Sequence, residues 1–304
     1  MAPALVHVDS LDLYRWLDYL APYPVAVTHH SVESELLRAR ARYLQPAILR
    51  PYLRYQAALI ERVERRFSPL VHLNVMMSDT DAERLRRLAP AARTLTVPNG
   101  VDIEALRPVP EAEIIPGRVV FLGPTYMFPN KDAVEFFLAE MWSAIRRSEP
   151  GATFEIIGKA SAVDRDRYAG VEGVIPRGYV TDIRPYLGRA ACSVVPIRVG
   201  GGTRLKILDA WAMGKAVVST SVGCEGLGAV DGENILIRNE PGGFTSAVLA
   251  VLRDEQLRRR LGQGGRATVE RNYSWDAVGG VLRGAYRDLI ASSERSVAPL
   301  RQAG

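Results

Sequence analysis

The second half of the sequence alternates strand-like and helix-like segments, and this alternation restricts the fold more than any other feature. Short apolar runs that predict strands lie at 118–123, 153–158, 173–180, 192–197, 216–222 and 234–238. Stretches with helical periodicity separate most of these runs. Strands that alternate with helices indicate a parallel, doubly wound sheet, and such sheets bind ligands at the carboxyl ends of their strands.

The first half repeats this pattern over a shorter length. The runs VHVDS, VAVTHH, VHLNVMMS and TLTVPNG predict four strands, with two helical stretches between the second and the third. Residues 99–118 contain three prolines and no clear period, which predicts a linker. We therefore expect a first domain over 1–114, a second over 115–285, and the end of the last helix with a polar tail over 286–304.

Length and composition agree with two globular domains. The chain has 304 residues, of which 47% are hydrophobic and 24% charged, which argues against disorder. No apolar stretch approaches the roughly 20 residues that span a bilayer, and the first residues lack the pattern of a signal peptide. Two cysteines give no disulfide framework, and Cys192 lies in a strand pattern typical of a core. We expect a cytoplasmic protein.

The net charge of +5 lies in residues 115–304, because the 14 Arg of residues 1–114 equal their 14 Asp and Glu. A basic half suits an acidic ligand, a membrane surface or nucleic acid, although an Arg-rich composition alone also explains it. The sequence has no zinc-finger spacing, no RNP-like aromatic motif and no clear helix-turn-helix pattern. We therefore expect no nucleic-acid partner.

The segment GGGTRLKILDAWAMGKAVVST, residues 200–220, follows the predicted strand at 192–197 and opens a helix. Its three glycines allow a tight turn and a close approach of the backbone to a ligand, and Thr203 suits an N-cap. Arg204 and Lys206 fall in the first helical turn, where the positive end of the helix dipole disfavours cations unless an anion joins them. The segment predicts a phosphate or diphosphate site, whereas the simpler interpretation is a glycine turn with solvated cations.

The rest of this helix presents two faces. Asp209 lies three residues after Lys206 on the same face and suits either a ribose or sugar ligand or an ordinary surface position. We expect Leu205, Leu208 and Ala212 on the opposite side, facing the core. Neither GxxxxGK[ST] nor GxGxxG after a strand occurs here, which excludes a Walker A loop and a dinucleotide fingerprint.

Six motifs along nearly the whole chain point to one family. They are VPNGVD (97–102), FLGPTYMFPNKDAVEFF (121–137), RGYVTDIRPYL (177–187), the 200–220 segment, VGCEGL (222–227) and YSWD (273–276). In this combination the chain resembles the family 4 glycosyltransferases, and its GGGTRLK loop is closest to the bacterial branch that builds surface polysaccharides. The resemblance implies the α/β GT-B fold of two facing, Rossmann-like, doubly wound domains, of which the first is incomplete here.

The resemblance implies a glycosyltransferase that moves a sugar from a nucleotide-diphosphate sugar to an acceptor hydroxyl, with retention, in polysaccharide or glycoconjugate synthesis. Arg204 and Lys206 would hold the diphosphate. Asp209 stands where the family has a ribose-binding glutamate and is about 1.5 Å shorter. Gly201 stands where many members have a second, sugar-binding glutamate. The implied donor-binding residues are Gly123, Gly178, Tyr179, Val180, Gly201, Gly202, Thr203, Arg204, Lys206 and Asp209.

The segment VAVTHHSVES (25–34) resembles the family segment in which a histidine at a strand's carboxyl end faces the transferred sugar. His30 fits best as the catalytic residue, and His29 is the alternative; both also suit ordinary polar loop positions. A histidine there would hydrogen-bond the sugar or the reacting oxygens and stabilise developing charge. We expect Glu33 and Ser34 to cap the next helix.

Two Asp-x-Asp triplets are compatible with a metal site, which is how another class of glycosyltransferases uses this pattern. Asp79 and Asp81 follow Ser78 at a predicted helix start, and Asp164 and Asp166 lie in a polar stretch. We expect all four to be structural. With two cations to neutralise the diphosphate, we expect a metal-independent enzyme with no cofactor besides its donor substrate.

Residues 38–66 carry eight Arg and three Tyr against two Glu. This stretch suits contact with an anionic membrane that holds a lipid-linked glycan acceptor, although a solvated helix face explains it slightly better. If the contact exists, the protein lies at the inner face of the membrane as a peripheral protein.

Two further expectations concern activity and assembly. A non-catalytic nucleotide-sugar-binding subunit or a truncated remnant is the alternative to an enzyme, whereas the loops argue against a GT-B epimerase or phosphorylase. With only four strands in the first half, Val6 and Val8 would lie on a sheet edge. Such an edge favours pairing with a partner, which could be another copy of this chain.

Overall fold

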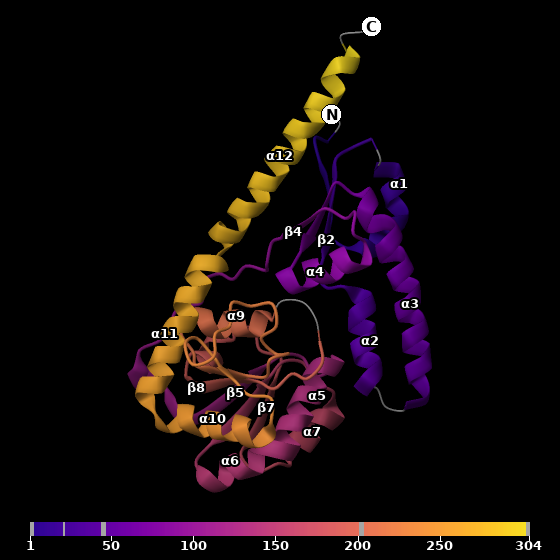
Figure 1. Ribbon diagram of the computed structural model, residues 1–304. Helices are drawn as coiled ribbons and strands as arrows, with labels where there is room; N and C mark the ends of the chain where they lie inside the picture. The colour runs from indigo at the N-terminus through magenta and orange to yellow at the C-terminus, as the bar shows by residue number, and fades with distance from the viewer. Residues whose placement is uncertain (1–2, 21, 44–46, 201–203, 302–304) are drawn as a thin grey trace. The chain divides into compact units, whose positions relative to one another are not determined.

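The structure is a computed structural model that describes residues 3–20, 22–43, 47–200 and 204–301 (Figure 1). The chain divides into two compact units. The first unit contains the described residues up to Asn99 and from Trp275 onward, and the second contains those from Gly100 to Ser274. The division thus differs from the boundary between 114 and 115 and from the end at 285 that the sequence suggested.

The proline-rich segment after Asn99 belongs to the second unit because its backbone is bonded there. The N–H of Val101 donates to the carbonyl oxygen of Tyr273 at 2.8 Å. Arg266 donates through Nη1 to the carbonyl oxygens of Ile103 and Leu106, at 3.2 and 2.8 Å. These contacts fix the segment along helix α11 (Glu255–Asn272), so it is packed against the second unit rather than a free linker.

The first unit is built on a four-stranded parallel sheet in the order β1-β2-β3-β4. Its strands are β1 (Val6–Val8), β2 (Val25–His29), β3 (Leu73–Met76) and β4 (Thr94–Thr96). All four expected strands are therefore present, and β1 lies at an edge of this sheet. Every residue of β2 and β3 is buried, as is typical of central parallel strands covered on both faces.

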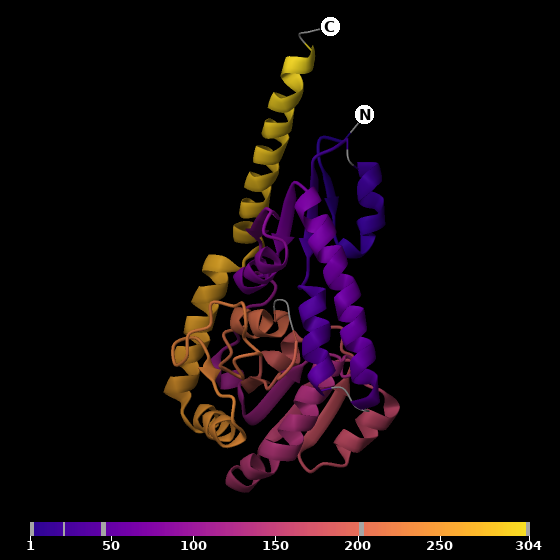
Figure 2. The ribbon, with the colours of Figure 1, turned by 45° about the vertical axis from the view of Figure 1, so that its right-hand side comes forward.

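The helices of the first unit are α1 (Leu17–Leu20), α2 (Glu33–Tyr43), α3 (Arg50–Phe67), α4 (Asp79–Leu88) and α12 (Trp275–Arg301). Helices α2 and α3 lie side by side as a hairpin (Figure 2). Helix α12 places Val278 and Leu289 in one apolar cluster with Ala26 and Val75 of the sheet. The last helix of the chain therefore completes the core of the first unit. It continues to Arg301, where a polar tail was expected.

The second unit contains a six-stranded parallel sheet in the order β10-β9-β8-β5-β6-β7. The strands are β5 (Ile115–Leu122), β6 (Thr153–Ile157), β7 (Val174–Gly178), β8 (Ala190–Val195), β9 (Val217–Ser219) and β10 (Leu236–Ile237). All six expected strands are present. The chain runs from β5 outward to β7 and then from β8 outward in the opposite direction, so the strand order reverses between β5 and β8.

The helices of the second unit are α5 (Phe128–Phe137), α6 (Ser143–Ser148), α7 (Ala162–Ala169), α8 (Arg184–Leu187), α9 (Leu205–Ala212), α10 (Pro241–Arg253) and α11 (Glu255–Asn272). Helix α10 packs against β8, β9 and α6, and α9 packs against α11. Within the described residues, no helix is long and apolar enough to cross a membrane.

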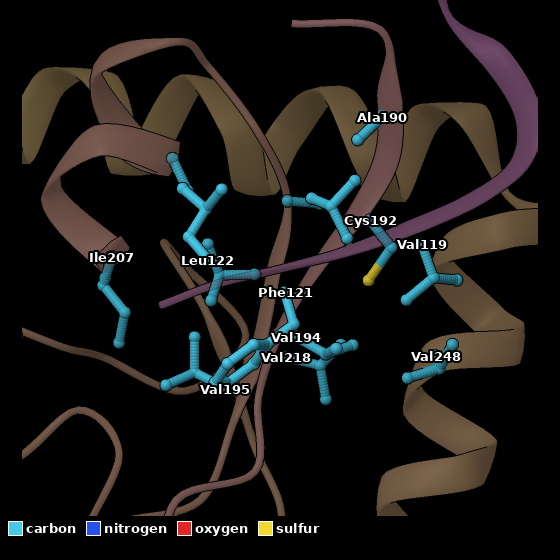
Figure 3. Packing of buried hydrophobic residues seen from close by; sticks show 14 of the residues in the cluster. Val119, Phe121, Leu122, Ala190, Cys192, Val194, Val195, Ile207, Val218 and Val248 are labelled. Atoms are coloured by element: carbon cyan, nitrogen blue, oxygen red, sulfur yellow. The ribbon is translucent and has the colours of Figure 1, made fainter. Parts of the chain in front are cut away.

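The core of the second unit gathers side chains from its central strands and the helices that cover them. Figure 3 shows Val119 and Phe121 of β5 beside Val194 of β8, with Val248 of α10 facing them. Cys192 is fully buried in this cluster, as expected, and burial raises the pKa of its thiol to about 12. This packed core holds the ends of β5 and β8 at fixed positions.

Candidate functional site

The carboxyl ends of β5 and β8 lie side by side where the strand order reverses, which we call the switch point. Open α/β sheets bind their ligands at this place. Gly123 follows β5 with a φ of 145°, a conformation that side chains rarely adopt. A Cβ atom on Gly123 would lie 2.8 Å from Nζ of Lys206 and 2.8 Å from Nδ2 of Asn130. Only glycine therefore lets the end of β5 lie beside the lysine.

Lys206 stands in the first turn of α9, in a confined position. Its Nζ donates to Oδ1 of Asn130 at 2.6 Å and lies 4.2 Å from the centroid of the Phe121 ring. Burial, with a smaller contribution from the charge of Arg204, lowers the pKa of Lys206 to about 7. A buried ammonium whose hydrogen-bond partner is a neutral amide is poised to be stabilised by an anion.

Arg204 precedes the first residue of α9 and is 9% exposed. Its Nη2 donates to the carbonyl oxygen of Val222 at 3.4 Å. A Cβ atom on Gly200 would lie 2.8 Å from the same Nη2, so the guanidinium lies against the backbone at the end of the β8 loop. The first turn of α9 contains no acidic residue. Two cations thus lie at the positive end of a helix dipole.

The remainder of α9 matches the sequence expectation at most positions. Asp209 is partly buried, and burial raises the pKa of its carboxyl to about 6. Leu208 and Ala212 are buried in the core as expected, but the prediction for Leu205 is wrong, because 49% of that side chain is exposed. Ile207 is buried instead, whereas Leu205 is the first residue of the helix.

The segment expected to meet the nucleobase lies at the carboxyl end of β7. Gly178 ends this strand with a φ of 74°, and its carbonyl oxygen accepts from the N–H of Gly158 at 2.8 Å. Tyr179 is 67% exposed, and Nζ of Lys159 lies 5.4 Å from its ring centroid. Val180 is partly buried against the core. The predicted roles of Gly201, Gly202 and Thr203 lie outside the described residues.

Comparison with known proteins identifies the region that contains this site. Residues 116–254 match the family described as Glycosyl transferases group 1. This stretch is therefore similar to the group 1 glycosyltransferases. It includes Gly123, Lys206, Arg204 and Asp209, so the cations at the switch point lie in the matched stretch.

One curated relative and two solved structures are similar to this chain. An uncharacterized glycosyltransferase of Methanocaldococcus jannaschii is 27% identical over 110 residues, which are 36% of this chain and 31% of that protein. Sucrose-phosphate synthase from Thermosynechococcus elongatus matches 95% of this chain and 74% of its own, with a TM-score of 0.75 and 20% identity. The structure of Anabaena HepE in complex with UDP and glucose matches 94% of this chain and 77% of its own chain, with a TM-score of 0.70 and 15% identity.

These matches establish the architecture around the matched stretch. At such identities the likeness to the solved structures shows the fold, which is the expected α/β GT-B arrangement with parallel sheets. The matched region spans less than a third of the archaeal relative, with 31% of its length.

The first unit separates the two candidate histidines by their surroundings. His29 is the last residue of β2, is 4% exposed, and bonds through Nε2 to Oδ1 of Asn74 at 2.9 Å. Burial lowers the pKa of His29. His30 lies just beyond the strand, has a half-exposed side chain, and bonds through Nε2 to the carbonyl oxygen of Asp9 at 3.1 Å. Only His30 can reach a ligand without breaking a buried contact.

Beside His30, a pocket is lined by residues of β2, α2 and α3, including Glu33 and Glu64. Glu33 is the first residue of α2 and accepts from Oγ of Ser31 at 2.6 Å. Ser34 is buried and donates through its N–H and its Oγ to the carboxylate of Glu64. Burial raises the pKa of Glu64. The capping acid at this helix start therefore comes from α3 and not only from Glu33 and Ser34 as expected.

The two Asp-x-Asp triplets begin helices. Asp81 N–H donates to Oγ of Ser78 at 3.1 Å at the start of α4. Asp164 N–H donates in the same way to Ser161 at the start of α7, and the carboxylate accepts from Lys131 at 2.7 Å. In the part of the chain that the structure describes, no group of three or more His, Cys, Asp or Glu could hold a metal ion.

The Arg-rich hairpin of α2 and α3 combines ion pairs with exposed apolar side chains. Arg38 pairs with Glu35 at 2.9 Å and with Glu61, which also pairs with Arg65 at 2.7 Å. Large exposed side chains cluster in the sequence around the start of α3, namely Ile48, Leu49, Tyr52 and Tyr55. Part of the positive charge is therefore neutralised within the hairpin.

Proposed function

We propose that this protein is a glycosyltransferase that moves a sugar from a nucleotide-diphosphate sugar to an acceptor hydroxyl. The observation that carries the proposal is the pair Arg204 and Lys206, which lie beside glycine backbone at the switch point, within the stretch that is similar to the group 1 glycosyltransferases. A diphosphate at this position would accept charge-assisted hydrogen bonds and lie at the favourable end of the α9 dipole.

The same two cations suit the chemistry of transfer. The acceptor oxygen forms a bond to the anomeric carbon, and the bond from that carbon to the β-phosphate oxygen breaks. The departing diphosphate keeps the electron pair of the broken bond, and the hydroxyl proton passes to it or to water. Positive charge that is fixed where this negative charge develops lowers the barrier without reorganisation. With this charge supplied by Arg204 and Lys206, we propose a metal-independent reaction, and the family resemblance favours retention of configuration.

Two further groups complete the proposed donor site. Asp209 would accept hydrogen bonds from the ribose hydroxyls, since it follows Lys206 by one helical turn and is mainly ionised above its pKa of about 6. The backbone around Gly178 and Tyr179 would meet the nucleobase. The substitution Asp209→Asn should weaken binding of UDP or GDP but not of a dideoxyribose analogue that lacks the hydroxyls.

We propose that His30 acts in the transfer step. Its support is a half-exposed side chain at the carboxyl end of β2 and the resemblance of the surrounding segment to that of the family. Its imidazole would hydrogen-bond the sugar or the reacting oxygens.

The acceptor is proposed to be a glycan or a lipid-linked glycan, with peripheral membrane contact through residues 38–66. The exposed Tyr52, Tyr55 and Ile48 beside arginines support this contact, because such surfaces bind anionic interfaces. Co-sedimentation with anionic and with zwitterionic vesicles tests it. Equal binding of the Tyr52→Ser, Tyr55→Ser double variant and the wild type would contradict the contact.

A second proposed partner is another copy of the chain at the β1 edge. Strand β1, which pairs only with β2 among the described strands, lies in the same unit as the exposed aromatic pair Trp16 and Tyr19, whose ring centroids are 5.8 Å apart. Light scattering at low and high protein concentration tests this pairing, and a monomer at both would contradict it.

Turnover decides between an enzyme and the alternative, a non-catalytic nucleotide-sugar-binding subunit. The protein is incubated with UDP-sugars and GDP-sugars, with and without a lipid-linked acceptor, and released nucleotide is measured. Acceptor-dependent release supports the enzyme. Tight donor binding without release would support the binding subunit, and no binding of any nucleotide sugar would overturn both.

A further inference from the structure

Asn130 has a position that neither its sequence motif nor the proposed chemistry explains. It lies in the first turn of α5, directly after the loop that leaves β5, and is 8% exposed. Its Oδ1 accepts from Nζ of Lys206 at 2.6 Å, although the two residues are 76 positions apart. A side chain at the start of α5, which follows β5, thus holds a side chain at the start of α9, which follows β8.

The orientation of the Asn130 amide is fixed by a second hydrogen bond. Nδ2 donates to the carbonyl oxygen of Pro124 at 3.0 Å, so Oδ1 faces the lysine. The Phe121 ring covers Lys206 at 4.2 Å, and the missing side chain of Gly123 leaves the room for both Nζ and the amide. The Asn130 amide, the Phe121 ring and the backbone of Gly123, which are all uncharged, therefore fix the position of the Lys206 ammonium.

Lys131, the next residue along the chain, shows the contrast. Its Nζ donates to both carboxylate oxygens of Asp164, at 2.7 and 3.0 Å. That lysine is neutralised by a formal negative charge and has a structural role. Lys206 is held equally closely, but by an uncharged acceptor, so its charge is not cancelled. An amide orients a lysine while leaving its charge for a ligand, whereas a carboxylate competes with the ligand.

We propose that Asn130 is a positioning residue that holds the Lys206 ammonium for the donor diphosphate without neutralising it. The inference rests on the proposed donor site and adds to it a second residue, from α5, that acts through the lysine. The role of Asn130 is electrostatic as well as steric. Position 130 requires a hydrogen-bond acceptor for Lys206, and that acceptor must be uncharged.

The test compares Asn130→Asp and Asn130→Ala with the wild type, using calorimetry with UDP, GDP and the matching nucleosides uridine and guanosine. Asn130→Asp retains the shape but introduces a carboxylate beside Lys206. We expect it to weaken diphosphate binding at least tenfold and to leave nucleoside binding unchanged, because nucleosides lack the phosphates. Asn130→Ala should weaken diphosphate binding several-fold, since the lysine loses its anchor. The matched control is Asn272→Asp, which makes the same change at an exposed position and should bind as the wild type does.

Each outcome decides one question. Wild-type diphosphate affinity in Asn130→Asp overturns the proposal. An equal loss of diphosphate and nucleoside binding in a variant that keeps the wild-type melting temperature also overturns it, because the loss would then not depend on the phosphates. Should Asn130→Asp fail to fold, unchanged diphosphate affinity in Asn130→Ala overturns it. Loss in Lys206→Ala together with wild-type affinity in both Asn130 variants rejects this inference alone. Absence of any nucleotide binding in the wild type rejects the donor site itself.

Discussion

The starts of α2 and α4 in the first unit differ from the start of α9 in the second, and the difference separates stability from function. In the first unit, α2 and α4 begin with acids and a capping group, supplied by Glu64 for one helix and by Ser78 for the other. In the second unit, α9 begins with Arg204 and Lys206 and no acid. A helix start with internal acids is satisfied by the chain itself. A start with cations is suited to an anion from outside.

The largest expected effect concerns the proposed catalytic side chain of the first unit. The substitution His30→Ala should lower the turnover rate by about 10²–10⁴-fold, the range for loss of a group that handles a proton or charge in the transition state. Donor binding and the melting temperature should stay near the wild-type values, because His30 is half-exposed.

The comparison variant is His29→Ala. It should lower the stability by about 1–3 kcal/mol, because the buried Oδ1 of Asn74 loses its hydrogen bond to the imidazole. Denaturant unfolding and a released-nucleotide assay measure both variants. If His29→Ala alone loses turnover at unchanged stability, the assignment belongs to the neighbouring histidine. Full activity in both would remove histidine from the mechanism.

The next effect concerns the cations at α9. The substitution Lys206→Ala should weaken UDP or GDP binding by about 1–3 kcal/mol, the cost of a lost hydrogen bond to a charged group. Lys131→Ala is the control, since that lysine is paired with Asp164 and should leave binding unchanged. Calorimetry measures both. Equal affinity in the wild type and Lys206→Ala would mean that the helix start is not the diphosphate site.

The pH dependence of diphosphate binding tests whether the cationic start of α9 binds the anion. Free Lys206, with a pKa of about 7, is half-protonated near neutrality, and a bound diphosphate favours its charged form. Binding above pH 7 therefore takes up a proton, and affinity should fall by up to about tenfold per pH unit as pH rises toward 9. Phosphate groups do not add to this slope, because their second pKa is about 6.

Calorimetry in two buffers of different ionisation enthalpy counts the proton taken up. Lys206→Met should show no uptake and a flat profile between pH 7 and 9. A wild-type affinity that is constant over this range would show that the lysine is already fully charged in the free protein.

The smallest expected effect tests the helix start that the chain satisfies internally. The substitution Ser78→Ala removes the cap of α4 and should cost about 1 kcal/mol of stability, with no change in diphosphate affinity. Urea unfolding and calorimetry measure the two quantities. A change in affinity as large as that of Lys206→Ala would erase the distinction between the two kinds of helix start.

The sequence was sufficient for the strands and for the cations because both depend on local patterns. Ten expected strands are present, and Arg204 and Lys206 lie at the helix start that follows the carboxyl end of β8, as the loop predicted. Asn130 and Glu64 were missed because each acts on a residue far away in the sequence, at 76 and 30 positions. A signal existed for Asn130, since it opens the helix directly after the first strand of the domain. The exposure of Leu205 depended on where the helix begins, which periodicity alone does not determine.

The packing of α12 has a consequence for how the chain is made. The first unit begins at the N-terminal end of this sequence, but its core includes Val278 and Leu289, which leave the ribosome after the whole second unit. The second unit is nearly contiguous, so it can fold during synthesis, whereas the nascent β1–β4 sheet waits with one face uncovered. Domains usually fold in the order of synthesis. Here we expect that order to be reversed, and we expect the uncovered sheet to be the stage at which a chaperone or a partner chain has the most time to act.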